Sequence, residues 1–294
     1  MINTRPCCRA HTRISASSAF GSPTANQCTA GNPADANADA KAGGHTITSL
    51  SDWDTLAGPK KDSHWVEGRS AFELAHAWIG TGTPSMPSAV RELLESVPAT
   101  RGLLVEDVHP EHRIPFDARR GEPRNADLAF LGQAASGTVA VTIEGKADEP
   151  FGDTVGETLA AALQRWNDND RSGGIGRVMD LVQALLPTST DTSPQASTLR
   201  YQLLTAAAGS LAYAAANNAV AAVLVVHEFK TGLTRLELHA RNDADYKAFL
   251  LRLECNVPEG SKRVLCGPIQ VPGLPLFPTP VPLYIGKITT TVQR

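Results

Sequence analysis

The sequence lacks any hydrophobic run long enough to cross a lipid bilayer. Its longest uninterrupted apolar stretch is the eight residues 219–226, whereas a transmembrane helix needs about 20. The early basic residues are not followed by an apolar segment of the kind found in secretory signals. We therefore expect a cytoplasmic protein without a membrane partner.

Cysteine is sparse, and its spacing excludes a zinc site of the usual kind. The five cysteines are Cys7, Cys8, Cys28, Cys255 and Cys266. They form no CxxC pair and no cysteine–histidine cluster with zinc-ligand spacing. The odd, low number is typical of a reducing compartment, so Cys255 and Cys266 are expected to be small apolar residues of the core.

Several common catalytic motifs are also missing. The sequence contains no Walker A, GxSxG or HExxH pattern, and the Gly173–Gly176 stretch lacks the spacing of a dinucleotide-binding loop. These absences count against P-loop NTPases, serine hydrolases of the nucleophile-elbow type and zinc proteases.

The first 45 residues differ in composition from the rest. They are rich in Ala, Asn, Thr, Ser and Gly and have almost no large apolar side chains. Such a segment cannot bury enough surface to offset the entropy of ordering, so residues 1–45 are expected to be a disordered leader. Residues 46–294 then form the domain, with 23 Lys/Arg against 28 Asp/Glu. This negative balance counts against tight, non-specific binding of nucleic acid.

The domain alternates helical and strand patterns, which predicts an α/β fold. Apolar spacing of three and four predicts helices near 65–79, 88–96, 154–166, 175–186, 199–216 and 243–254. Strands are expected near 102–109, 126–131, 138–146, 220–229, 235–239 and 284–291. The almost wholly apolar residues 220–229 suit a strand with helices on both faces of its sheet. A proline-rich extension precedes the last strand.

Three ionisable residues come together in the expected hairpin. Glu144 and Lys146 are two residues apart on its second strand, so both side chains should leave the same face. With a turn that pairs Leu131 with Thr138, Asp127 lies one diagonal step from Glu144. This register predicts that two carboxylates and one ammonium group converge at one end of the hairpin.

This combination suits metal-assisted chemistry on phosphate. The carboxylates of Asp127 and Glu144, joined by the carbonyl oxygen of Gly145, are suitable ligands for Mg²⁺ or Mn²⁺. The cation would polarise a phosphodiester oxygen and make a bound water more acidic. Lys146 could orient that water or stabilise the charge that develops on phosphate.

An Asp on one strand and E-x-K on the next, with helices on either side, resemble the PD-(D/E)xK superfamily of restriction and repair nucleases. The resemblance covers about residues 65–229. It implies a restriction-endonuclease-like fold with a central mixed sheet flanked by helices. It also implies that Asp127 and Glu144 ligate metal and that Lys146 is the catalytic lysine. Asn125-Ala126 replaces the usual proline before the aspartate, and Gly145 occupies a position that is more often apolar.

Members of the superfamily often add an acid from the first core helix. Glu67 stands where that helix is expected to begin and is our candidate for this role, with Glu73 as the alternative. Asp148 and Glu149 follow the motif directly and are expected to cap the next helix or to be solvated, or else to hold a second metal. The plainer interpretation of Glu144 and Lys146 is an exposed ion pair on a strand.

Candidate contacts to nucleic acid are basic or amide side chains close to the motif, although a solvated loop remains the default for the arginines. These candidates are Arg69, Arg119, Arg120, Arg124 and Gln202. Gln202 begins the long alanine-rich helix, where superfamily nucleases sometimes place a Gln or Tyr. His227 and Glu228 end the buried strand, where α/β proteins tend to carry functional groups.

The resemblance leads to two alternative functions. The first is Mg²⁺-dependent phosphodiester hydrolysis of nucleic acid, with DNA as the expected substrate and a homodimer as a common arrangement for cutting two strands. The second is a catalytically idle nuclease fold that serves as a binding or regulatory module. A third class, an enzyme with a small substrate, would require a deep pocket that sequence alone does not reveal.

Overall fold

The computed structural model describes residues 39–59, 62–80, 84–119, 121–188, 190, 192–255 and 263–293, and they belong to one compact unit, Asp35–Arg294. The strands are β1 Asp39–Ala42, β2 His45–Ile47, β3 Leu104–Ile114, β4 Arg124–Ala134, β5 Gly137–Lys146, β6 Ala221–Lys230, β7 Cys266–Ile269 and β8 Leu283–Thr291. The helices are α1 Leu50–Ala57, α2 Ser70–Ile79, α3 Ser88–Leu94, α4 Val155–Asp168, α5 Gly174–Leu185, α6 Tyr201–Ala216 and α7 Leu236–Arg252, with short 3-10 turns at Asp62–His64 and Ala196–Thr198.

The described strands form a single mixed sheet in the order β2-β1-β3-β4-β5-β6-β8-β7. Its centre is parallel, because β5 pairs with β6 and β6 pairs with β8 in the same direction. The β3–β4 and β4–β5 pairs are antiparallel. The prediction of an α/β protein with a mixed sheet flanked by helices is therefore confirmed at this level.

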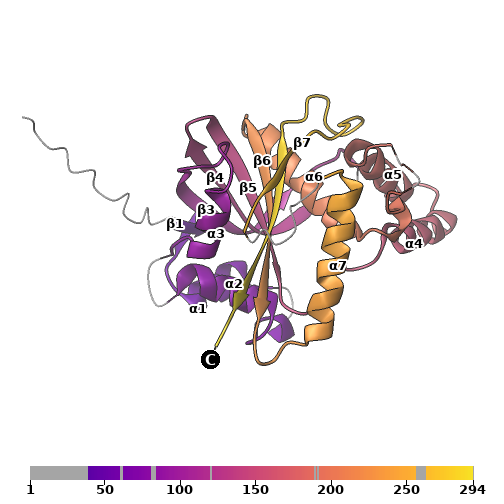
Figure 1. The fold of residues 1–294 in the computed structure, drawn as a ribbon. Coiled ribbons are helices and arrows are strands. Elements are labelled where there is room, and N and C mark those ends of the chain that lie inside the picture. The colour runs from indigo at the N-terminus through magenta and orange to yellow at the C-terminus, as the bar shows by residue number, and fades with distance from the viewer. Residues whose placement is uncertain are drawn as a thin grey trace, which may run out of the picture. The chain divides into compact units, whose positions relative to one another are not determined.

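Helices cover both faces of the sheet (Figure 1). Helices α1 to α3 pack on one face, and α6 lies across the other, where it contacts β3, β4, β5, β6 and β8. Helices α4 and α5 pack against each other, and α5 also packs on α6. Each face has its own buried apolar cluster. Among the described helices, none is both long enough and apolar enough to span a membrane.

Local sequence explains the central elements. Thr154 and Glu157 form a capping box at the start of α4, in which each side chain accepts from the other residue's backbone N–H. Strand β6 is buried along all but its last residue, as expected for a strand with helices on both faces. Gly132, which was predicted to begin a turn, instead lies within β4, and Leu103 packs in the space that a side chain at this position would occupy.

Ordered structure begins earlier than the expected boundary at residue 46. Strand β1 pairs with β3 through Ala40 and Val108, and Ala40 is fully buried. The strand depends on backbone hydrogen bonds rather than on large apolar side chains, so composition did not indicate it. Residues 1–38 of the predicted leader lie outside the described residues.

The strand expected near residues 235–239 is wrong, because this segment is the first turn of α7. The buried residues of α7 include His239, Asn242, Tyr246 and Phe249. They recur at intervals of three and four, which is the period of one helix face. The helix therefore extends over both the predicted strand and the predicted helix that follows it.

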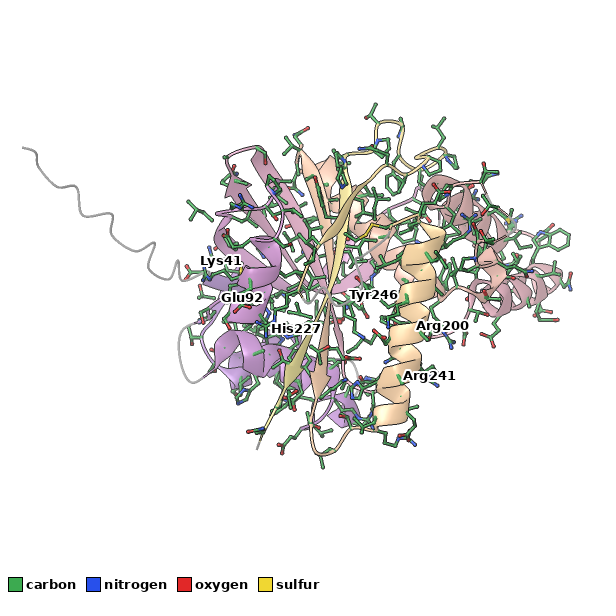
Figure 2. All side chains as sticks on the ribbon, in the orientation of Figure 1. Lys41, Glu92, Arg200, His227, Arg241 and Tyr246 are labelled. Carbon is green, nitrogen blue, oxygen red and sulfur yellow. A yellow bond between two sulfur atoms is a disulfide. The ribbon has the colours of Figure 1, made fainter. Side chains whose placement is uncertain are left out.

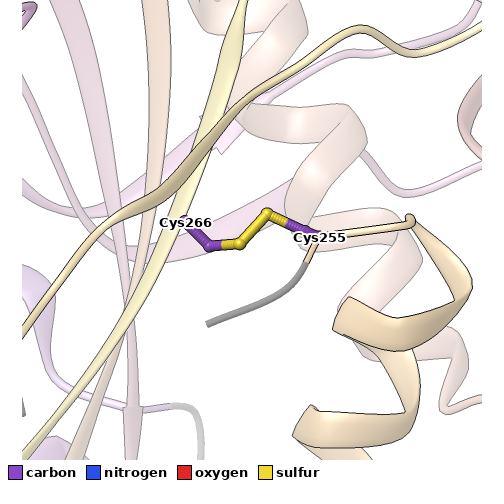
Figure 3. The surroundings of a disulfide bond; sticks show 2 residues. All are labelled: Cys255 and Cys266. Atoms are coloured by element: carbon purple, nitrogen blue, oxygen red, sulfur yellow. A yellow bond between two sulfur atoms is a disulfide. The ribbon is translucent and has the colours of Figure 1, made fainter. Parts of the chain in front are cut away.

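Cys255 and Cys266 form a disulfide, with their Cα atoms 6.1 Å apart (Figure 3). The bond joins the segment after α7 to the first residue of β7. The expectation that these cysteines are unpaired apolar residues is therefore wrong. Their separation of 11 residues resembles no metal-binding motif, and two cysteines brought together by the fold carry no local signal.

Reducing this disulfide is expected to lower the free energy of unfolding by roughly 2–3 kcal/mol, because it restores conformational entropy to the unfolded chain. Urea unfolding of the wild type with and without dithiothreitol would measure the change. The Cys255→Ala variant cannot form the bond, so its free energy of unfolding should equal that of the reduced wild type and should not change with dithiothreitol. An equal response of wild type and variant to the reductant would contradict a stabilising role for the bond.

Candidate active site

Strand β5 carries Glu144 and Lys146 on the sheet face that α6 covers. Thr142, two residues earlier, marks this face because its hydroxyl lies 2.6 Å from the Ser210 hydroxyl of α6. Lys146 Nζ donates to Glu144 Oε1 at 2.8 Å. Only 1% of Glu144 and 6% of Lys146 is exposed. The strand thus brings the two side chains together as predicted, and the plainer interpretation of a solvent-exposed pair is wrong.

Glu144 is the centre of a buried polar cluster. Besides the bond to Lys146, its Oε1 accepts from Gln202 Nε2 at 2.6 Å. Its Oε2 pairs with the guanidinium of Arg124 at the start of β4. Gln202 lies in the first turn of α6, so the sequence-predicted amide does reach the motif. Two strands and a helix therefore converge on one carboxylate.

Asp127 reaches the same strand through its backbone. Its Oδ2 accepts the N–H of Gly145 at 2.7 Å. The β4–β5 register pairs Leu131 with Ala140 rather than with Thr138, and the last paired residue before Asp127 is Leu128. The predicted register is therefore wrong by two residues, and Asp127 ends against the main chain of β5.

Burial dominates the electrostatics of the two cations. Desolvation lowers the pKa of Lys146 below its ordinary value, and Arg124 lowers it further, whereas Asp127 and Glu149 oppose the shift. Desolvation also lowers the pKa of Arg124, against the opposing effect of Asp127 and Glu111. Asp127 is thus close enough to influence both cations that hold Glu144. The three motif residues share one electrostatic environment.

A cleft of about 590 Å³ opens beside this cluster. Its lining includes Asp127, Asn125, Glu111 and Glu149 together with residues at the start of α2, but neither Glu144 nor Lys146. Glu149 accepts from the Ser70 backbone N–H at 3.1 Å. The cleft is therefore acidic, and Asp127 is the motif residue that it exposes.

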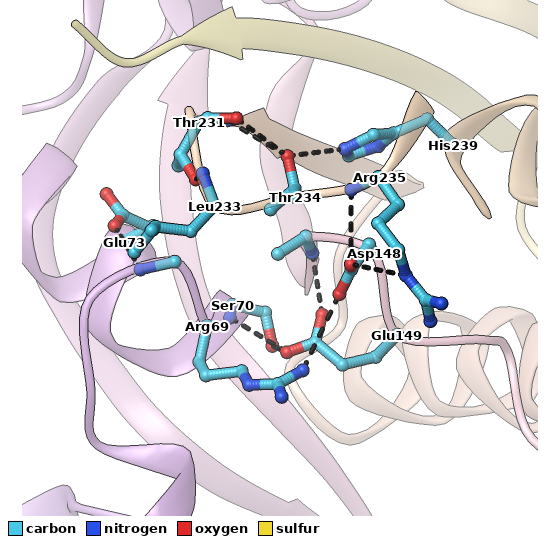
Figure 4. Close-up of polar contacts among 12 residues, drawn as sticks. Arg69, Ser70, Glu73, Asp148, Glu149, Thr231, Leu233, Thr234, Arg235 and His239 are labelled. Carbon is cyan, nitrogen blue, oxygen red and sulfur yellow. Dashed lines mark hydrogen bonds and ion pairs between the residues drawn. The ribbon is translucent and has the colours of Figure 1, made fainter. Parts of the chain in front are cut away.

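The loop after β5 is tied to two other loops (Figure 4). Asp148 accepts the backbone N–H of Arg235 at 3.2 Å and pairs with Arg69 at 3.5 Å. Glu149 contacts Ser70 at the beginning of α2. The expectation that these two acids cap the helix after them is wrong, because Thr154 caps α4. They instead join β5 to α2 and α7.

The predicted acid of the first core helix is not where the sequence suggested. Helix α2 begins at Ser70, so Glu67 lies in the exposed turn before it. Glu73 is buried in the helix, and its carboxylate accepts the Gly68 N–H at 2.8 Å. Glu111 and Glu149 are the additional acids that line the cleft, and the one that contacts the start of α2 is Glu149. Its position directly after the E-x-K motif was the only sequence signal for it.

The basic candidates do not gather into one patch. The Arg124 side chain is only 12% exposed and pairs with Glu144. Arg119 pairs with Asp180 of α5 at 2.6 Å. Arg69 is 47% exposed next to Asp148 at the cleft. Arg120 lies outside the described residues.

Comparison with known families matches residues 46–291 to a family described as a domain of unknown function, DUF6946. The chain belongs to the DUF6946 family. The matched region contains the whole Asp127, Glu144 and Lys146 cluster and the cleft beside it. No curated protein and no solved structure matches the chain.

Among the described residues of this DUF6946 chain, no group of three or more His, Cys, Asp or Glu side chains is arranged to hold a metal ion. Mg²⁺ requires fewer protein ligands, since it keeps several waters and is bound by one or two carboxylates with substrate phosphates. A carboxylate has about four acceptor positions. Asp127 uses one of them for Gly145, whereas Glu144 accepts from three donors. Carboxylates are the donors that Mg²⁺ prefers, and Asp127 is the one of the two that lines the cleft.

Proposed function

We propose that the chain hydrolyses phosphodiester bonds of nucleic acid, with DNA as the expected substrate, through a metal-dependent site of the PD-(D/E)xK type. The observation that carries the proposal is that Lys146 and Gln202 both donate to Glu144 at the end of β5, while the next residue, Gly145, donates its N–H to Asp127 in the acidic cleft. Gln202 is distant in sequence from the hairpin, yet it donates to the Glu144 carboxylate. A carboxylate that is 1% exposed needs hydrogen-bond donors, and one of the donors here is the amide on the helix where the resemblance expects it.

The arrangement of elements agrees with a restriction-endonuclease-like fold. Helix α2 precedes the β4–β5 hairpin, and α4 to α6 follow it before the parallel strand β6. The site lies at the carboxyl end of β5, where parallel strands of α/β proteins commonly place functional groups. This order is the one that the sequence resemblance implies.

Each side chain has a distinct role in the proposed reaction. Asp127 and Glu144 would hold the cation, which would supply Lewis-acid polarisation of the phosphate and a more acidic bound water. Lys146 would stabilise negative charge developing on phosphate, and its low-dielectric surroundings strengthen that effect. Gln202 fixes the orientation of Glu144 by donating to Oε1. The Gly145 N–H positions the Asp127 carboxylate.

One observation favours the idle nuclease fold as a second candidate. Glu144 already pairs with both Arg124 and Lys146, and neither Glu144 nor Lys146 lines the cleft. A cluster closed in this way can serve structure alone, since buried charges that neutralise each other need no ligand. The fold would then act as a binding or regulatory module.

The two candidates differ in the expected effect of Asp127→Asn. With full-length protein, labelled single- and double-stranded DNA should be cut in Mg²⁺ or Mn²⁺ and not in EDTA. The variant should lower kcat/KM at least about 100-fold, which is ~2.7 kcal/mol of transition-state stabilisation.

Asp107→Asn is the matched control, because Asp107 of β3 pairs with Lys41 of β1 and does not line the cleft. Its activity should equal that of the wild type. Cleavage that survives Asp127→Asn would contradict the assigned site. Absence of cleavage together with absence of Mn²⁺ binding in calorimetry would favour the idle fold.

A further inference from the structure

A second and larger cavity, of about 870 Å³, lies between α7 and the ends of β6 and β8. It shares no lining residue with the acidic cleft. Its volume falls within the range of roughly 300–1,000 Å³ that is typical of small-molecule sites. It is also located at the carboxyl ends of two parallel strands, where α/β sheets commonly bind ligands.

The floor of this cavity is a buried ionic network. Glu228 of β6 is 2% exposed, and its Oε1 lies 3.1 Å from His239 Nδ1 and 3.2 Å from Lys287 Nζ. Lys287 Nζ also lies 3.3 Å from Asp243 Oδ1 on α7. The network joins the two strands to the helix and fixes these side chains, so the polar groups of the floor are preorganised.

The cavity carries an excess of positive charge in a chain with a net charge of −3. Lys230, Lys247, Arg263 and Lys287 line it, against the carboxylates of Glu228 and Asp243. Lys247 has a side chain that is 72% exposed, whereas that of Lys287 is 12% exposed. Lys247 pairs with Asp243 at 2.6 Å and Arg263 pairs with Glu92, so an anionic ligand would share these cations with their carboxylates. The excess of positive charge in the lining still favours such a ligand.

Part of the wall is apolar. Tyr246, Leu250 and Ile288 are buried side chains that line the cavity, and Leu236 adds an exposed edge. A ligand that fills this space would need a flat or apolar body, an anionic end for the lysines and hydrogen-bond donors for Asp243. Asp243 already pairs with Lys247 and Lys287, but a carboxylate has about four acceptor positions, so its 41% exposed side chain can still accept such bonds.

We propose that this cavity binds a nucleoside phosphate. The phosphate would lie between Lys230 and Lys247 at the mouth, and the base would pack on Tyr246 and Leu250. Hydroxyl or amino groups of the ligand would donate to Asp243. This site is separate from the proposed nuclease chemistry, and its occupancy does not depend on a metal in the cleft.

Calorimetric titration of full-length protein with ADP, AMP, adenosine and inorganic phosphate tests the proposal. The titrations are made in EDTA on the Asp127→Asn background, so that the cleft does not contribute. ADP or AMP should bind saturably, at least about tenfold more tightly than adenosine or phosphate. Changing both Lys230 and Lys247 to alanine should weaken that binding by a further factor of about ten.

Lys41→Ala is the matched control, because Lys41 is on β1, far along the sheet from β6 and β8 (Figure 2). Its affinity should be unchanged, and the thermal unfolding of all variants should match that of the parent. The proposal is overturned if no nucleotide binds saturably, if phosphate alone binds as tightly, or if the lysine double variant keeps full affinity. None of these outcomes bears on DNA cleavage.

Discussion

Replacing Glu144 with leucine is expected to lower the free energy of unfolding by roughly 3–5 kcal/mol. The leucine leaves Arg124 and Lys146 without the carboxylate that now pairs with both. Their side chains are only 12% and 8% exposed, so water can replace the lost partner only in part. An uncompensated charge in such a place costs far more than a lost surface ion pair.

Urea unfolding at neutral pH would measure this loss. Asp127→Asn is a suitable comparison, because it weakens one hydrogen bond to Gly145 and should cost only about 1 kcal/mol. Adding Arg124→Met to Glu144→Leu should recover part of the stability, since one orphaned charge is removed, and the double-mutant cycle gives the coupling energy. A loss below about 1 kcal/mol for Glu144→Leu would mean that the cluster is hydrated.

Acidification is expected to destabilise the protein through His227. This side chain is fully buried in β6, and burial lowers its pKa to about 3 from an ordinary value of 6.5. The neutral ring lies 2.9 Å from the Thr290 hydroxyl and packs against Phe229. The folded state binds a proton at His227 less readily than the unfolded state does. The contribution of the neutral His227 to the free energy of unfolding is therefore fully present above pH 6.5 and is lost as the pH falls toward 3.

The free energy of unfolding falls by about 1.4 kcal/mol per pH unit for one proton, so the loss through His227 reaches roughly 3 kcal/mol by about pH 4. The His227→Phe variant lacks the titrating ring and should show a shallower decline. The free energy of unfolding of both proteins would be measured in urea at several pH values between neutral and acidic. The carboxylates titrate in both proteins, so the difference between the two curves is the effect of His227. Parallel curves would show that His227 accepts its proton in the folded state.

Local pattern predicted most of the elements. The hairpin of β4 and β5, the apolar strand β6 and the alanine-rich α6 were expected close to their observed positions, because each has a clear period or composition. Strand β1 was missed, since its residues have little intrinsic strand signal and pair with β3 across the chain. The first turn of α7 was mistaken for a strand, because a segment of five residues can match both the two-residue period of a strand and the 3.6-residue period of a helix.

The part of the site that follows from local sequence pattern was predicted. Alternation along β5 is a local property, and it brought Glu144 to Lys146. The register of the hairpin follows from a turn that pairs Ala134 with Gly137 rather than Leu131 with Thr138, so the position of Asp127 could not be read from spacing. The roles of Arg124 and Glu149 depend on burial and on the start of α2. The disulfide and the cavity under α7 also arise only when distant segments meet.

The parallel centre of the sheet has a consequence for folding. Strands β5, β6 and β8 are neighbours in space, yet β6 begins long after β5 ends, and β8 is the last of the described strands. Such pairings have high contact order and form slowly, because the long loop between the strands must close before the strand contacts can form. A chain emerging from the ribosome exposes the apolar edge of β6 until Leu283–Thr291 has been made. Newly synthesised protein should therefore depend on chaperones most strongly in this interval.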